Sequence, residues 1–133
     1  MTALEETAET LRGACVGHRP EVDASVTGKG SEAGWNPALD QILASYTLES
    51  GWDGEGAPAP SRPLLAAAMR LATDLRKLRC PAPARAVVSL DGTIILEWQQ
   101  SGDLVELELL APGRAELTIH RTGRPTSHTP LSW

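Results

Sequence analysis

Four glutamates give this chain its clearest chemical pattern, because their spacing indicates that they gather on one face of a β-sheet. They are Glu97, Glu106, Glu108 and Glu116. If neighbouring strands keep their apolar residues on the opposite face, Glu97 lies across from Glu106, and Glu108 lies across from Glu116. Like charges directly opposite each other destabilise a strand pair. The pattern is therefore typical either of a solvated sheet face or of a docking surface for a basic partner.

Two apolar residues, Val88 and Ile95, are expected on the same face as the glutamates, with Thr93, Thr118 and His120 around them. An acidic patch with an apolar centre would steer a basic protein toward the sheet and then anchor it. Metal binding is the weakest interpretation, because glutamates without aspartate or histidine in close array make a poor ligand set. We therefore expect neither a metal ion nor a cofactor.

The second predicted helix has the opposite charge. Arg62, Arg70 and Lys77 fall on nearly one of its faces, and Arg79 follows at its end. An ordinary solvated face would explain them, since bases are favourable near a helix C-terminus. The alternative is a contact with nucleic acid, although no aromatic residue is interleaved for base stacking. The net charge of −5 argues against nucleic acid as a partner on its own, whereas two faces of opposite charge would suit self-association.

The residue types that could catalyse a reaction are not grouped along the sequence. His18, His120 and His128 are scattered over different predicted segments, and Asp53 and Glu55 have no base or nucleophile near them in sequence. Nucleophilic catalysis needs such a partner within hydrogen-bond reach. The sequence therefore favours a protein that is not an enzyme.

Cysteine usage and the N-terminus indicate the compartment. Cys15 and Cys80 stand far apart, without a CxxC pair or a Cys/His run at zinc spacing, so we expect reduced thiols. The N-terminus has neither the basic start nor the apolar segment of a signal peptide, and no apolar stretch approaches the length of a transmembrane helix. The sequence predicts a cytoplasmic protein with no membrane partner.

Two helices and four strands are predicted to position these groups. Asn36 and Pro37 begin a helix over 37–49, and Ser61 caps a second helix over 62–79. The apolar period then changes from helical to alternating, which predicts strands over 85–90, 93–99, 104–110 and 115–120. Their short glycine-containing turns make neighbouring strands antiparallel. The prediction is an α+β fold in which two helices pack on one face of a four-stranded antiparallel β-meander, with a flexible N-terminal arm.

The same alternation predicts which residues face the core. With a two-residue turn at Asp91-Gly92, Val87 lies opposite Leu96. Trp52 stands in a glycine-rich loop, and we expect it to be buried against the second helix. The first helix has an apolar stripe of Leu39, Ile42, Leu43 and Tyr46. The predicted inner face of the sheet comprises Val87, Ile94, Leu96, Trp98, Val105, Leu107, Leu109, Leu117 and Ile119.

The chain is predicted to have three parts. Residues 1–34 form a mobile acidic arm with a short helix over 3–12, residues 35–121 form the α+β domain, and residues 122–133 form a C-terminal tail. The helix in the arm carries too little apolar surface to be stable alone, so it either docks on the domain or waits for a partner. We expect the arm to be dispensable for folding and to become ordered on a partner.

Two motifs in the domain resemble those of a known group of proteins. Leu48–Ala57 contains a GWDGxGA loop, Pro60 and Ser61 start the following helix, and Asp91–Trp98 reads DGxIxLEW. Together they resemble a group of small uncharacterised bacterial proteins that share this loop and hairpin. The resemblance covers about residues 39–110 and implies a shared fold. It carries over no functional residue.

These observations favour a non-enzymatic protein–protein interaction module that uses its acidic sheet face. An antitoxin, an immunity protein or an accessory subunit of a larger bacterial effector would have these properties, and its partner would present a basic surface. The alternative is an accessory nucleic-acid or nucleoprotein-binding component that uses the basic face of the second helix. Charge reversal on each face would distinguish the two.

Overall fold

The computed structural model describes residues 2–16, 33–100 and 102–133. The described helices are α1 (Ala3–Val16), α3 (Asn36–Ala44) and α4 (Arg62–Lys77), with a short 3-10 helix, η1 (Ser45–Thr47), after α3. The strands are β1 (Arg85–Val88), β2 (Ile94–Gln100), β3 (Asp103–Ala111), β4 (Arg114–His120) and β5 (Ser127–Ser132). They form one antiparallel sheet in the order β1-β2-β3-β4-β5. The α+β class and the antiparallel meander are confirmed, but the domain has three helices and five strands where two and four were predicted: α1 covers the short helix predicted over 3–12 in the arm, and β5 was not predicted.

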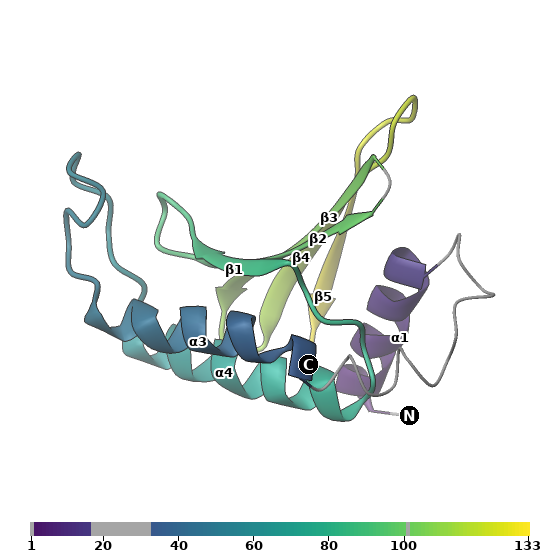
Figure 1. The fold of residues 1–133 in the computed structure, drawn as a ribbon, viewed down its shortest axis with the longest axis horizontal. Helices are drawn as coiled ribbons and strands as arrows, with labels where there is room; N and C mark the ends of the chain where they lie inside the picture. The colour runs from purple at the N-terminus through teal and green to yellow at the C-terminus, as the bar shows by residue number, and fades with distance from the viewer. Residues whose placement is uncertain (1, 17–32, 101) are drawn as a thin grey trace.

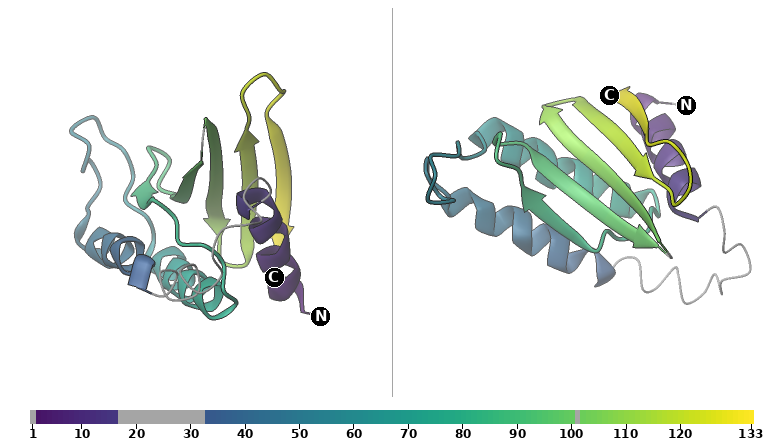
Figure 2. Two further views of the ribbon diagram at one scale, coloured as in Figure 1. Left: turned by 45° about the vertical axis from the view of Figure 1, so that its right-hand side comes forward. Right: turned by 90° about the horizontal axis from the view of Figure 1, so that it is seen from above.

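The helices lie on one side of the sheet. Figure 1 shows α3 and α4 side by side under one face, and Figure 2 shows α1 at the β5 side of the sheet. Buried side chains of α1, α3, α4 and the inner sheet face belong to a single hydrophobic core. Over the other face, which we call the outer face, no helix lies among the described residues. The outer face is therefore the broad surface on which strand residues can meet a partner.

Helix α1 corrects the prediction of a mobile arm over residues 1–34. Thr2 caps it, since the Glu5 backbone N–H donates to Thr2 Oγ1 over 3.1 Å. Ala8, Leu11 and Cys15 are buried in the core. Of the two predicted alternatives, the helix docks on the domain, because helical spacing gathers its few apolar residues on one face. The rest of the predicted arm, residues 17–32, lies outside the described residues.

Helix α3 is shorter than the predicted helix over 37–49. Trp35 rather than Asn36 is at the N-cap, and Leu43 is 58% exposed instead of facing the core. The side chain of Gln41 serves the sheet, because its Oε1 accepts the backbone N–H of Ala86 over 2.6 Å. This contact satisfies one backbone N–H of the edge strand β1, so that N–H is not free to pair with another strand.

Helix α4 confirms the predicted start at 62 and ends at Lys77, two residues before the predicted end at 79. The backbone N–H of Leu64 donates to Ser61 Oγ over 3.2 Å at its start. At its end, Arg79 adopts a positive φ of 62°, and the N–H of Cys80 donates to the carbonyl of Leu75 over 3.0 Å. This is a Schellman cap with arginine in the position that usually holds glycine. Arg79 therefore belongs to the C-terminal cap of α4 and does not continue the helical face of Arg62, Arg70 and Lys77.

The register is confirmed between β2, β3 and β4 and is wrong by one residue for β1. Leu96 lies opposite Leu107, as predicted, but Val87 lies opposite Ile95 and not Leu96. The β1–β2 loop is longer than a two-residue turn, because the N–H of Ser89 donates to the carbonyl of Thr93. A one-residue slip exchanges the two faces of a strand. Val88 therefore packs against the core, and Val87 lies on the outer face.

The predicted burial of Trp52 against the second helix is wrong. Trp52 is half-buried and stands outside the core cluster, and its Nε1 donates to the carbonyl of Pro58 over 3.0 Å. Asp53 Oδ1 accepts the N–H groups of Glu55 and Ala57, which lowers the pKa of Asp53. The loop is thus organised by its own hydrogen bonds, and Figure 1 shows it projecting at the far end of α3.

The predicted C-terminal tail over 122–133 is also corrected, because most of it forms β5. Thr129 lies opposite Leu117, and Leu131 lies opposite Ala115 on the core side. Trp133 is partly buried against the core, and its N–H donates to the carbonyl of Gly113 over 3.1 Å. The strand completes the β4 edge and adds its alternate side chains to the outer face.

Candidate functional site

The outer face brings together the predicted glutamates. Glu97 lies opposite Glu106, and Glu108 lies opposite Glu116, so both expected like-charge pairs are present in the register. Glu97, Glu106 and Glu108 nevertheless each have a hydrogen-bonding neighbour of their own, and Glu116 lies beside the His128 ring. These neighbours, and not an exchange of one glutamate for a lysine, relieve the cross-strand repulsion.

Glu97 is withdrawn from any partner by Arg85. The Arg85 Nε donates to Glu97 Oε1 from the neighbouring strand β1, and the Glu97 residue is only 7% exposed. The prediction of Glu97 as a docking residue is corrected on this ground. The sequence prediction missed the pair because its β1 register was wrong by one residue, and the correct register sets Arg85 opposite Glu97.

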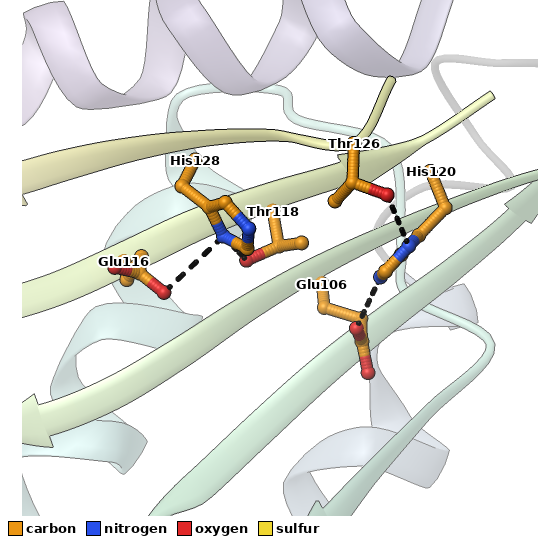
Figure 3. Close-up of polar contacts among 6 residues, drawn as sticks. All are labelled: Glu106, Glu116, Thr118, His120, Thr126 and His128. Carbon is orange, nitrogen blue, oxygen red and sulfur yellow. Dashed lines mark hydrogen bonds and ion pairs between the residues drawn. The ribbon is translucent and has the colours of Figure 1, made fainter. Parts of the chain in front are cut away.

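Glu106 is held by a histidine on the adjacent strand. His120 Nε2 lies 3.0 Å from Glu106 Oε1, and His120 Nδ1 lies 3.2 Å from Thr126 Oγ1 in the β4–β5 connection (Figure 3). The side chain of Glu106 is 26% exposed. The imidazole therefore bridges a carboxylate and a hydroxyl, and the carboxylate stays open to the solvent on one side.

Glu116 is next to a second histidine, which β5 supplies. His128 Nδ1 lies 3.5 Å from Glu116 Oε1 and 3.1 Å from Thr118 Oγ1 (Figure 3). The side chain of Glu116 is 42% exposed. The sequence prediction left His128 in a tail, so this pair was missed. The strand gives no clear signal in the sequence, because its residues are mostly polar and include Pro130.

Glu108 is held by hydroxyl groups from the β1–β2 hairpin. Thr93 Oγ1 donates to Glu108 Oε2 over 2.6 Å, and Ser89 Oγ lies 2.6 Å from Thr93 Oγ1. Of the predicted apolar centre, Ile95 does lie on the outer face, beside Glu108 in the register. Val88 does not, and Val87 takes its place next to Ile95.

The bases of the alternative site lie on the other side of the molecule. Arg62, Arg70, Lys77 and Arg79 are all exposed. Helix α4 packs under the inner face of the sheet, so these bases share no surface with the glutamates. The guanidinium carbon of Arg62 lies 5.9 Å from the centre of the Tyr46 ring. This cation–π contact gives Arg62 a structural role in the fold.

The possible metal ligands and the two cysteine thiols of the described residues can be considered together. Among those residues, no group of three or more histidine, cysteine, aspartate or glutamate side chains could hold a metal ion. Burial raises the pKa of Cys15 to about 12 and also raises the pKa of Cys80. Such thiols remain protonated at neutral pH and are poor nucleophiles. His18 lies outside the described residues.

Comparisons with known proteins add no family. No protein-family model matches this chain, and neither the curated proteins nor the solved structures gave a match. The likeness of the Leu48–Ala57 and Asp91–Trp98 motifs to small bacterial proteins therefore stays a prediction. Among the described residues, no helix has the length and apolar character to span a membrane.

Proposed function

We propose that this chain is a non-enzymatic protein–protein interaction module whose outer sheet face docks a basic protein surface. One observation carries the proposal: on the uncovered face, Glu106 and Glu108 are hydrogen-bonded to an imidazole and a hydroxyl group, and Glu116 lies 3.5 Å from the His128 imidazole. Within the described residues none of the three forms an ion pair with lysine or arginine. We call these three residues the docking carboxylates.

Hydrogen bonding prepares two of the docking carboxylates, Glu106 and Glu108, for a partner. A side chain that is already held in place loses less conformational entropy when a partner binds it. Glu106 and Glu116 keep exposed surface for a second interaction, and the half-buried Val87 and Ile95 supply apolar contact next to Glu108. Charge would accelerate the encounter, and the apolar contact would slow dissociation.

The partner classes that suit this module follow from its chemistry. A toxin or effector protein with a basic active surface would be occluded by the outer face, in which case the chain would serve as an antitoxin, an immunity protein or an accessory subunit in the cytoplasm. A second copy of this chain, presenting its exposed α4 bases, is the self-association variant of the same idea.

Charge reversal on the outer face provides the test. We expect the double variant Glu106→Lys/Glu116→Lys to bind a fluorescein-labelled oligolysine peptide about tenfold more weakly than the wild type, because two attractions become repulsions. The matched control is Glu9→Lys/Glu49→Lys, which changes two exposed residues away from the outer face by the same net charge. Fluorescence anisotropy at low and high salt measures the affinities, and circular dichroism checks that each variant folds.

The comparison of the two double variants decides the result. An equal loss in both would mean that only the net charge of the protein attracts the peptide, which would contradict a docking face. Binding of a single-stranded oligonucleotide that Arg70→Glu/Lys77→Glu abolishes, with no effect of the glutamate variants, would favour the nucleic-acid alternative instead.

A further inference from the structure

Two histidines stand among the docking carboxylates, one from β4 and one from β5. Figure 3 shows the His120 ring directed toward Glu106, and the His128 ring close to Glu116 and Thr118. Histidine is the side chain whose charge changes most readily between pH 5 and 8. The pairs Glu106–His120 and Glu116–His128 therefore each contain one negative carboxylate and one ring that can become positive.

The contacts of His120 suit both of its charge states. A carboxylate only accepts hydrogen bonds, so His120 Nε2 carries the proton that faces Glu106. In the neutral ring Nδ1 then accepts from the Thr126 hydroxyl, and in the protonated ring Nδ1 donates to the oxygen of the same hydroxyl. The Thr126 hydroxyl can rotate to serve either role. Protonation thus changes the charge here without loss of a hydrogen bond.

His128 makes a looser version of the same arrangement. Its Nδ1 faces both Glu116 Oε1 at 3.5 Å and Thr118 Oγ1 at 3.1 Å. A protonated ring would place its positive charge beside the Glu116 carboxylate. His120 and His128 are 44% and 57% exposed at their side chains, so protons reach both rings freely.

The other charged groups around the two rings leave this balance intact. On β3, Asp103 lies 4.0 Å from the Nε of Arg121, which follows β4, so these two charges offset each other. On β4, Arg114 pairs in register with Ser132, at the far end of the strand from His120. No helix among the described residues covers this face. The charges nearest the rings are therefore those of Glu106 and Glu116.

We propose that His120 and His128 make the docking face pH-sensitive, so that a basic partner binds at neutral pH and is released as the pH falls. Protonation of both rings compensates Glu106 and Glu116 and leaves Glu108 as the one docking carboxylate whose donor is not titratable. This inference rests on the proposed function, because it describes the regulation of the same face.

The test compares the full-length wild type with His120→Gln/His128→Gln. Glutamine keeps a polar N–H group at each position but cannot acquire a charge. For the wild type, we expect the affinity for the labelled oligolysine peptide to fall by about two- to fivefold per histidine between pH 7.5 and 5.5, the range expected for exposed ion pairs. For the double variant, we expect less than about a twofold change over the same interval. Each single variant would show about half of the effect on a logarithmic scale.

The outcomes separate this inference from the proposed function. A double variant that binds at pH 7.5 but keeps the full pH dependence would overturn the inference and leave the docking face standing. Absence of binding by the wild type at pH 7.5 would overturn both. As a second measurement, nuclear magnetic resonance of the wild-type imidazole carbons follows protonation directly, and rings that keep one charge state from pH 7.5 to 5.5 would contradict the inference even if the variant failed to fold.

Discussion

Replacement of Trp35 by alanine is expected to lower the free energy of unfolding by about 3–5 kcal/mol, the usual cost of truncating a buried large aromatic residue. Trp35 is fully buried, and its ring meets the Trp98 ring edge-on, with centroids 6.4 Å apart and an interplanar angle of 76°. Its Nε1 donates to the carbonyl of Cys80 over 3.0 Å. The side chain therefore joins the start of α3 to the segment between α4 and β1, and without it these elements lose their common contact.

Two control variants distinguish the parts of this effect. Trp35→Phe keeps a ring but removes the donor to the buried Cys80 carbonyl, and we expect a smaller loss of about 1–3 kcal/mol. Trp52→Ala removes a tryptophan that lies outside the core, and we expect a smaller loss than for Trp35→Ala. Urea unfolding followed by circular dichroism measures all three. Equal losses for Trp35→Ala and Trp52→Ala would contradict the core assignment.

Replacement of Leu11 by alanine is expected to lower the free energy of unfolding by about 2–5 kcal/mol, because Leu11 is a fully buried side chain of α1. Helix α1 also reaches the end of α4 through Arg12, whose Nη1 donates to the carbonyl of Leu78 over 2.5 Å. A helix that was merely an arm would tolerate this change. The loss would show that α1 is a structural part of the domain.

The matched control for Leu11→Ala is Glu9→Ala, an exposed position two residues away on the same helix. We expect the control to stay within about 0.5 kcal/mol of the wild type. Urea unfolding of the two variants gives the comparison. If Leu11→Ala behaved like Glu9→Ala, α1 would contribute nothing to the core, and the expectation that residues 1–34 are dispensable would return.

The parts of the fold that local patterns govern could be predicted from the sequence. Helix α4 has a serine cap, a proline in its first turn and a regular apolar stripe, so its existence and its start follow from these signals. The register of β2 with β3 is likewise determined by a short turn at Gly102 together with strict alternation, which sets Trp98 opposite Val105. The Glu97–Glu106 pair follows from that register, and the Glu108–Glu116 pair follows from the register of β3 with β4.

The remaining features depend on contacts between distant segments, which spacing does not reveal. The loop between Ser89 and Thr93 is one residue longer than the two-residue turn that Asp91-Gly92 suggests. This extra residue shifts the β1 register, so Val87 and not Val88 lies on the outer face. Strand β5 is polar because it is an exposed edge strand, so it resembles a tail. Since His128 belongs to that strand, its pairing with Glu116 could not be predicted once β5 was missed.

A binding footprint tests most directly whether the outer sheet face is the docking surface. The full chain, labelled with ¹⁵N, would be titrated with the oligolysine peptide at pH 7.5 while the backbone amide chemical shifts are recorded. We predict that the largest shift changes occur along the outer face, at Ile95, Glu106, Glu108, Glu116 and Thr118. Largest changes at the exposed acids of α1, Glu5, Glu6 and Glu9, or in the loop around Asp53, with the outer face unchanged, would contradict a docking role for that face.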